Sequence, residues 1–331
     1  MTTKPNFEPI FQDLPSALLI GDPVRFQNLT MIPLMAQTVT ANQFVYMLMD
    51  QALESGALEI NEVSEAGSVP NLRAKVIGDI DVLLLDGEEL IGEKQNRTLN
   101  LSILAPAREE TLLPVSCVEA GRWSRQSCGF SSSNRMHFSK GRAAKMSSVS
   151  ANLMESGLAE SNQRQVWDDI EEKLTALSAC SETAAMADAF DSVTNQIEPF
   201  VENFSPQPHQ IGAVFMINDQ AETLEIFDLP ETFARILPKL IRSLAIDAIE
   251  TVDNQTRLAE NPPTSNDLIK ATVKELIAKA LSGSAQTFPG TGKGESVRLL
   301  TPEFEAGALV HEGNLLHLTG AFNVDILERQ N

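Results

Sequence analysis

The segment that decides the fold runs from Glu88 to Trp123 and reads EELIGEKQNRTLNLSILAPAREETLLPVSCVEAGRW. Its alternating apolar residues predict two β-strands, because successive side chains of a strand point to opposite faces. Loop 105–110 joins the two strands. The apolar positions that we assign to the core are Leu99, Leu101, Ile103, Leu113, Val115 and Cys117. The opposite face of the first strand is predicted to be a polar ladder.

A polar cluster remains once these core positions are set aside. It is formed by Lys94, Gln95, Asn96, Arg97 and Asn100. Amides and a guanidinium leading into a polar ladder are suited to bind a ring edge, ribose hydroxyls or phosphate. We therefore predict that these five residues bind a ligand. A solvated turn is the alternative that the same residues allow.

The end of the second strand carries two further candidates. Glu119 is a candidate general base and Arg122 a candidate anion clamp, and we name them as the catalytic pair. A structural ion pair that ends the sheet is the alternative. Cys117 has basic neighbours that favour a thiolate, but its place on the apolar face indicates a core residue instead.

Composition and charge limit the classes of partner. Across 331 residues the net charge is −20, so the bulk surface repels nucleic acid and anionic membranes. No signal peptide and no apolar run of membrane-spanning length are present, and we expect a soluble cytoplasmic protein. Three cysteines without a CxxC pair and scattered histidines predict no metal site. The cofactor, if the protein uses one, stays unknown.

The chain is predicted to fold as α+β. An N-terminal antiparallel β-sheet or sandwich is followed by helices packed on a second small antiparallel sheet. The predicted parts are a proline-containing arm at 1–23, an antiparallel β domain at 24–123, a basic serine-rich connector at 124–162 and an α+β domain at 163–331. The stretch 120–154 contains six basic residues and no acid, and it has no clear periodicity.

Local signals place several turns and helices. Asp86-Gly87 and Asn218-Asp219 are typical of hairpin turns. Helical spacing predicts helices from Gln163, from about Pro230 to Ile249 and from Ser265 to Leu281. A final hairpin is expected at Gly313-Asn314. PGTGKGES at 289–296 lacks the spacing of a phosphate loop and precedes a strand, so we interpret it as a mobile hairpin loop.

The quoted segment also resembles a known bacterial family. GEELIGEKQNRTLNLSIL, PVSCVEAGRW and the later GALVHEGNLLHLTGAF are similar to the ADP-ribosylglycohydrolase- and rhodanese-phosphatase-associated protein domain. The resemblance implies a role associated with NAD and ADP-ribose processing, without an established reaction. It carries over to the positions Gly92, Lys94, Gln95, Asn96, Arg97, Asn100, Cys117, Glu119, Arg122 and Trp123.

Two functional hypotheses follow. The first is recognition, extending to hydrolytic processing, of a nucleotide or ADP-ribose-like small molecule at the polar cluster and the Glu119/Arg122 end of the sheet. The second is a non-enzymatic assembly module. In it the polar residues form a structural network, and the proline-containing arm and the basic segment contact other copies in a homo-oligomer.

Overall fold

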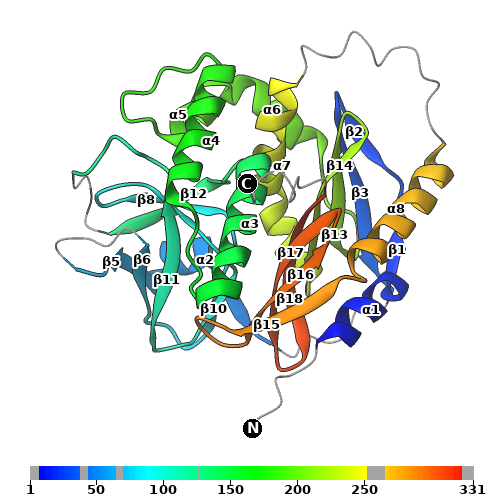
Figure 1. Cartoon of the computed structure of the whole chain (residues 1–331), viewed down its shortest axis with the longest axis horizontal. Coiled ribbons are helices and arrows are strands. Elements are labelled where there is room, and N and C mark those ends of the chain that lie inside the picture. The colour runs from blue at the N-terminus through cyan, green and yellow to red at the C-terminus, as the bar shows by residue number, and fades with distance from the viewer. Residues whose placement is uncertain are drawn as a thin grey trace. The chain divides into compact units, whose positions relative to one another are not determined.

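The computed structural model describes residues 7–37, 44–64, 70–124, 127, 129–251 and 265–322 (Figure 1). Internal contacts divide the chain into two compact units. Unit 1 comprises residues 1–41, 195–287 and 297–331, and unit 2 comprises residues 42–194 and 288–296. Both units combine helices with largely antiparallel strands, which confirms the predicted α+β class.

Unit 1 is built on a nine-stranded sheet. Its strands are β1 (Leu18–Ile20), β2 (Val24–Phe26), β3 (Leu29–Ala36), β13 (Gln210–Ile217), β14 (Gln220–Phe227), β15 (Ser284–Pro289), β16 (Glu295–Thr301), β17 (Phe304–His311) and β18 (Asn314–Phe322). They lie in the order β1-β3-β13-β14-β18-β17-β16-β15, and β2 pairs with β3. Three strands from the N-terminus therefore join a sheet that is otherwise formed by the last third of the chain.

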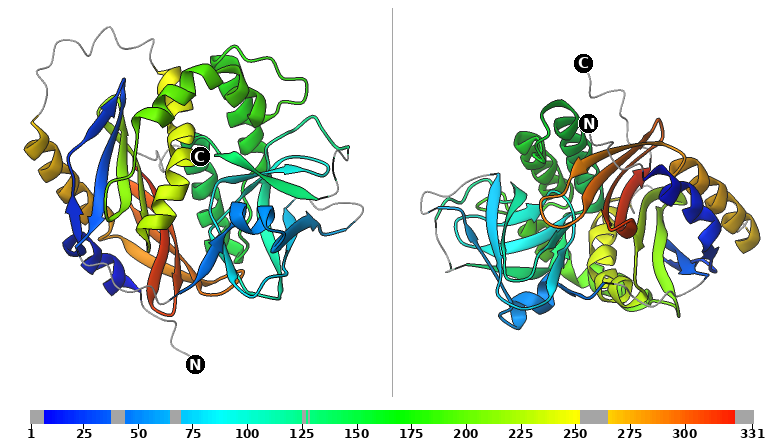
Figure 2. Two further views of the ribbon diagram at one scale, coloured as in Figure 1. Left: turned by 180° about the vertical axis from the view of Figure 1, so that it is seen from behind. Right: turned by 90° about the horizontal axis from the view of Figure 1, so that it is seen from below.

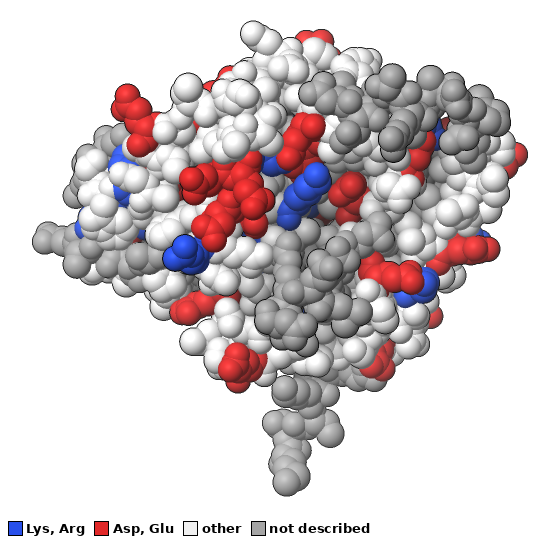
Figure 3. Space-filling view, turned by 45° about the horizontal axis from the view of Figure 1, so that its top comes forward, with Lys and Arg blue, Asp and Glu red and all other residues white. Residues whose placement is uncertain are grey.

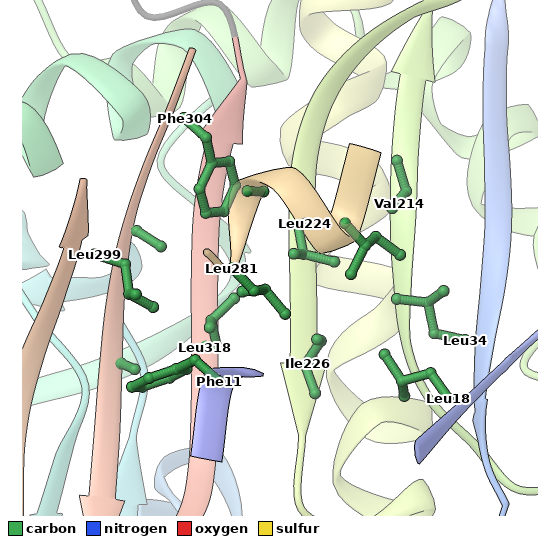
Figure 4. Packing of buried hydrophobic residues seen from close by; sticks show 14 of the residues in the cluster. Phe11, Leu18, Leu34, Val214, Leu224, Ile226, Leu281, Leu299, Phe304 and Leu318 are labelled. Carbon is green, nitrogen blue, oxygen red and sulfur yellow. The ribbon is translucent and has the colours of Figure 1, made fainter. Parts of the chain in front are cut away.

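The helices of unit 1 cover both faces of this sheet. They are α1 (Glu8–Ala17), α6 (Thr194–Asn203), α7 (Pro230–Glu250) and α8 (Asn266–Ala280). Figure 2 shows α1 and α8 on one face and α7 on the other. Alternate residues of the strands, such as Val214, Leu224 and Leu318, form the core under α1 and α8 (Figure 4). The period-two pattern of each strand supplies this apolar face.

The proline-containing arm contains the ten-residue helix α1. Residues 1–6 lie outside the described residues, but α1 follows directly and ends where β1 begins. Phe11 of α1 is completely buried in the core of unit 1. Burying a phenylalanine stabilises a fold by roughly 1.5–3 kcal/mol. The prediction of a surface arm is therefore wrong for α1, because its apolar face packs within its own unit.

Unit 2 contains two further sheets. Its strands are β4 (Tyr46–Leu48), β5 (Leu58–Glu62), β6 (Asn71–Val76), β7 (Asp81–Leu84), β8 (Glu88–Gly92), β9 (Arg97–Leu99), β10 (Ile103–Ala105), β11 (Glu110–Cys117) and β12 (Phe130–Met136). One sheet has the order β10-β7-β4, with β4 parallel to β7, and the other has the order β12-β8-β9-β11-β6-β5. The helices are α2 (Met49–Glu54), α3 (Ser139–Ser156), α4 (Gln163–Ala176) and α5 (Met186–Ser192).

The Asp86-Gly87 pair does not form the predicted hairpin. Glu88 N does donate to Leu85 O at 3.1 Å, as in a turn, but β7 and β8 belong to different sheets. Asp86 is buried, and its carboxylate lies 2.6 Å from Lys145 Nζ. The turn thus carries the chain from one sheet to the other, and a buried ion pair fixes it there.

The strand predicted through residues 96–103 is broken in two. β9 pairs with β8 and β11, whereas β10 pairs with β7. The break at 100–102 lets one apolar run serve both sheets, and Leu99, Leu101 and Ile103 are all buried in the same core.

The predicted connector at 124–162 is regular structure inside unit 2. Residues 130–136 form β12 and residues 139–156 form α3. Arg125 and Cys128 lie outside the described residues. Arg142 and Lys145 of α3 are buried, and Lys145 pairs with Asp86. The periodicity was hidden because basic side chains occupy the inward face of the helix, where apolar residues are the rule.

The compact units also divide the chain at places that differ from the predicted boundaries. Residue 123 lies in the middle of unit 2, because β11 and β12 belong to the same six-stranded sheet. In the described ranges no helix is long and apolar enough to cross a membrane. Asp and Glu side chains gather on the face drawn in Figure 3, as the net charge of −20 leads one to expect.

Candidate functional site

The turn between β8 and β9 presents the predicted ligand-binding residues. Gly92 has a φ of +139° and Glu93 a φ of +44°. A Cβ atom on Gly92 would lie 2.5 Å from the carbonyl oxygen of Gly129, so the chain requires glycine here. This backbone places Lys94 at the surface and directs the following residues inward, where Gln95 and Asn96 are buried.

Glu119 and Arg122 form a buried ion pair. Arg122 Nη2 lies 2.6 Å from Glu119 Oε2 and donates to Asn96 Oδ1 at 3.1 Å. Arg122 Nη1 donates to the carbonyl oxygen of Glu93 at 2.9 Å. The second carboxylate oxygen, Glu119 Oε1, accepts from Thr183 Oγ1 at 3.0 Å. Both predicted catalytic side chains are therefore bonded to the protein itself.

The same carboxyl group fixes the turn that carries Lys94. Asn96 N donates to Glu119 Oε2 at 3.2 Å, and Gln95 Nε2 donates to the carbonyl oxygen of Glu119 at 2.8 Å. Burial raises the pKa of Glu119, but the hydrogen bonds from Arg122, Asn96 and Thr183 outweigh it and hold the pKa below its ordinary value. Glu119 is accordingly a poor proton acceptor at neutral pH.

Arg97 is completely buried beneath this turn. Its Nη1 donates to Gln95 Oε1 at 3.0 Å, and its Nη2 lies 3.6 Å from Glu62 Oε1. Its guanidinium carbon is 5.8 Å from the ring centroid of Trp123. Lys94 Nζ lies 5.3 Å from the same centroid, and Trp123 is 49% exposed. A partly exposed indole therefore lies beside two cations.

Asn100 belongs to a different polar cluster. Its Oδ1 accepts from Ser116 Oγ at 2.6 Å, and its Nδ2 donates to the carbonyl oxygen of Ala159 at 3.0 Å. Ser116 Oγ also lies 2.5 Å from Ser161 Oγ. These bonds tie β11 to the segment between α3 and α4. The break in the predicted strand separates Asn100 from the other four predicted ligand-binding residues.

Cys117 is a core residue. Burial raises the pKa of its thiol. Its Sγ donates to the carbonyl oxygen of Glu119 at 3.3 Å, and its backbone is bonded in both directions to the side-chain amide of Gln163. The thiol is thus kept protonated and covered.

A surface cavity of about 540 Å³ lies beside the turn. Its polar lining consists of Asn61, Glu62, Ser64, Arg73, Glu93 and Lys94. Asn61 and Arg73 are direct neighbours on β5 and β6. Arg97 reaches this cavity only through Glu62, with which it pairs. Lys94 is the one predicted ligand-binding residue among the described residues that line it.

Sequence reasoning missed Asn61, Glu62, Ser64 and Arg73. Asn61, Glu62 and Arg73 lie on antiparallel strands, on which alternate polar residues ordinarily face solvent, and Ser64 follows β5. Arg73 alternates with the buried Leu72 and Ala74, so nothing in the local pattern distinguishes it from a solvated arginine. The cavity forms where segment 70–76 and the 92–97 turn come together, and the local sequence of neither segment shows that they meet.

The loop within PGTGKGES docks against β10. Lys293 N donates to Leu104 O at 2.8 Å, and Lys293 Nζ lies 2.7 Å from Asp81 Oδ2. The segment leads into a strand, β16, as the sequence predicts. Elsewhere, His317 Nε2 lies 3.2 Å from Glu225 Oε2 in the interior of unit 1. Across the described ranges, no group of three or more His, Cys, Asp or Glu side chains could hold a metal ion.

Residues 17–321 match the model of one protein family, the ARG and Rhodanese-Phosphatase-superfamily-associated Protein domain. The match extends over most of both units and includes the turn, the buried pair and the cavity described above. No curated protein and no solved structure matches the chain.

Proposed function

The chain belongs to the family of ARG and Rhodanese-Phosphatase-superfamily-associated Protein domains, and we propose that it binds a phosphorylated nucleotide-like molecule in the cavity beside the 92–97 turn. One observation carries the proposal. A cavity is lined by two cationic side chains, Arg73 and Lys94, and Lys94 Nζ also lies 5.3 Å from the ring centroid of the half-exposed Trp123. ADP-ribose and NAD are members of the ligand class that this arrangement suits.

Three features of the cavity and its surroundings suit this ligand class. Arg73 and Lys94 supply positive charge for phosphate oxygens, and an arginine can bind two of these oxygens at once. The Asn61 amide and the Ser64 hydroxyl can bond to sugar hydroxyls. Trp123 offers an aromatic surface on which a base can stack. A volume of about 540 Å³ lies within the range of small-molecule sites.

The buried network has a supporting role in this proposal. Arg122 bonds to Glu93, and Glu119 bonds to Gln95 and Asn96, so the turn is tied to the segment that leads into Trp123. Lys94 on the turn and Trp123 after the segment are held together by these bonds. Positioning of this kind reduces the ordering cost of ligand binding.

We do not include hydrolysis in the proposed function. A general base needs a lone pair within reach of the attacking water. Both carboxylate oxygens of Glu119 accept hydrogen bonds from the protein, and its pKa is lowered. Glu119 and Arg122 are therefore proposed as positioning residues for a binding site.

The assembly hypothesis has less support, although a buried polar network is part of it. It relied on an arm and a basic segment that contact other copies. In the described residues, Phe11 of the arm is buried in unit 1, and Arg142 and Lys145 of the basic segment are buried in unit 2. Homo-oligomer formation remains a separate proposal that light scattering over a range of protein and salt concentrations would test.

Isothermal titration calorimetry with ADP-ribose, NAD, ADP and inorganic phosphate tests the binding proposal. We expect heat with the nucleotides, and about ten- to hundredfold weaker binding by Arg73→Ala, because a hydrogen bond to a charged group is worth about 1.5–3 kcal/mol. Trp123→Ala should weaken the binding of the nucleotides but not the binding of inorganic phosphate.

The matched control is Arg164→Ala. Arg164 is an exposed arginine of unit 2 that pairs only weakly with Asp168, at 3.7 Å. This variant should bind like the unmodified protein. Absence of heat with every nucleotide, or equal affinity of the Arg73→Ala and Arg164→Ala proteins, would contradict the proposed function.

A further inference from the structure

The six-stranded sheet of unit 2 has an open seam. Its end strands, β5 and β12, each have a partner on one side, β6 and β8 respectively. The two end strands approach each other at Gly129, where an added Cβ would lie 3.2 Å from Asn61 Oδ1 and 3.5 Å from Ile60 O. No ladder joins β5 to β12 among the described residues. In the described part of the chain, the two edges thus approach closely at Gly129 but are not paired as strands.

A second cavity, of about 680 Å³, lies along this seam. It is lined by Leu58–Asn61 of β5, by Gly129–Asn134 at β12 and by three residues of α2. Its apolar lining includes Leu58, Ile60 and Phe130, which belong to the core of unit 2. The two end strands, β5 and β12, therefore border the same hollow. Among the described residues, each of them is paired with a strand on one side only. The cavity is lined by residues 58–61 of β5, the proposed nucleotide site is lined by residues 61–64, and the two share Asn61.

Among the described residues, the ionisable side chains that line the seam cavity are Asp50, Glu54 and Glu59, all of them acidic. Asp50 accepts a hydrogen bond from Ser132 Oγ, which links α2 to β12. Glu54 and Glu59 are exposed. A bound molecule would therefore meet backbone donors and acceptors along the strands and negative charge above them.

Charge on an edge strand has a simpler use, which is to prevent association between sheets. Such protection requires no cavity. Here two edge strands of one sheet border a cavity whose buried side is apolar and whose exposed side carries carboxylates. That geometry matches peptide recognition by strand addition, in which main-chain bonds give affinity and alternate side chains give specificity.

We propose that the seam binds an extended basic segment of another protein by adding it as a strand at β5 and β12. Alternate Lys or Arg side chains of that segment pair with the exposed carboxylates of Glu54 and Glu59, and the intervening side chains face the buried side of the cavity at Leu58 and Phe130. This interaction does not rest on the proposed nucleotide binding, because it uses residues 58–60 of β5 and a ligand of the opposite charge.

Panning a display library of short random peptides against the intact protein tests the proposal. The Glu54→Lys/Glu59→Lys protein serves for counter-selection, and Glu155→Lys/Glu171→Lys is the matched control, because all four glutamates are exposed. We expect enriched peptides with Lys or Arg at alternate positions. Fluorescence anisotropy should give about tenfold weaker binding by the double reversal and unchanged binding by the control.

Hydrogen exchange identifies where the enriched peptide binds. Strand addition predicts slower exchange of amides in β5 and β12, and N-methylation of alternate peptide amides should abolish binding because it removes ladder donors. The proposal fails if no peptide is enriched, if protection maps to other elements, or if N-methylated peptides bind equally well.

Discussion

Arg122 Nη2 and Glu119 Oε2 lie 2.6 Å apart, and both side chains are buried. Two residues that looked like a catalytic pair thus satisfy each other. Removing one partner of a buried ion pair leaves the other charge without compensation, which costs about 3–5 kcal/mol.

Arg122→Ala should therefore destabilise unit 2 by about 3 kcal/mol or more. Both tryptophans, Trp123 and Trp167, belong to unit 2, so their fluorescence during urea unfolding follows this unit. Arg164→Ala, an exposed arginine of the same unit, should change the free energy of unfolding by less than about 0.5 kcal/mol. Equal midpoints for the two variants would show that the pair contributes no net stability.

The stability of unit 2 should fall in acid because of His137. Burial, and then the charge of Lys145, lowers the pKa of this imidazole from 6.5 to about 3. Between pH 6.5 and about pH 3 the unfolded chain binds a proton at His137 that the folded protein does not bind. The contribution of the neutral imidazole to the free energy of unfolding is therefore complete above pH 6.5 and is lost as the pH falls. The slope attributable to His137 is up to about 1.4 kcal/mol per pH unit.

A His137→Gln variant should lack this contribution. Urea unfolding of both proteins at several pH values between 7 and 4 gives the difference in their unfolding free energies. We expect that difference to shrink or change sign toward acid, because only the unmodified protein has an imidazole that must stay neutral. Parallel pH profiles would mean that His137 titrates normally in the folded state.

Gly292 permits the 288–296 segment to dock. A Cβ atom there would lie 2.2 Å from the carbonyl oxygen of Leu104, which is the acceptor of the Lys293 amide. Gly292→Ala should weaken this contact by about 1–3 kcal/mol and so speed hydrogen exchange at Lys293 by about ten- to hundredfold. Thr291→Ala, an exposed change in the same segment, should leave exchange unaltered. Unchanged protection in Gly292→Ala would refute the steric role.

Cys117 should resist alkylation in the folded protein. Its thiol is buried and its pKa is raised, whereas Cys180 is exposed. Brief treatment with iodoacetamide followed by peptide mass spectrometry should find the label on Cys180 but not on Cys117. Both should be labelled in urea. Rapid native labelling of Cys117 would restore it as a nucleophile candidate.

Local patterns predicted much of unit 1 from the sequence. The turn at Asn218 and Asp219 has positive φ at both residues, as the hairpin signal requires, and α7 runs from Pro230 to Glu250. Ser265 caps α8 by accepting from Leu268 N at 3.3 Å. These elements depend on neighbours in the sequence, so their residues suffice to identify them.

The predictions failed where distant segments decide the structure. The helix α3 can place Lys145 in the interior because Asp86, far away in sequence, compensates its charge. Strand parity did separate the core residue Cys117 from the polar residues around it. It could not show that Glu119 and Arg122 would be buried, or that Arg73 and Lys94 would line one cavity, since both depend on how the strands pair.

The way unit 1 is assembled along the chain has a consequence for protein synthesis. Strand β3 pairs with β13, as Met31 does with Phe215, but the whole segment 42–194 is translated between them. The segments of β1, β2 and β3 therefore emerge from the ribosome long before any other strand of their sheet has been synthesised. Unpaired strands are prone to aggregate, so the N-terminal strands are the part of the nascent chain that most needs a chaperone.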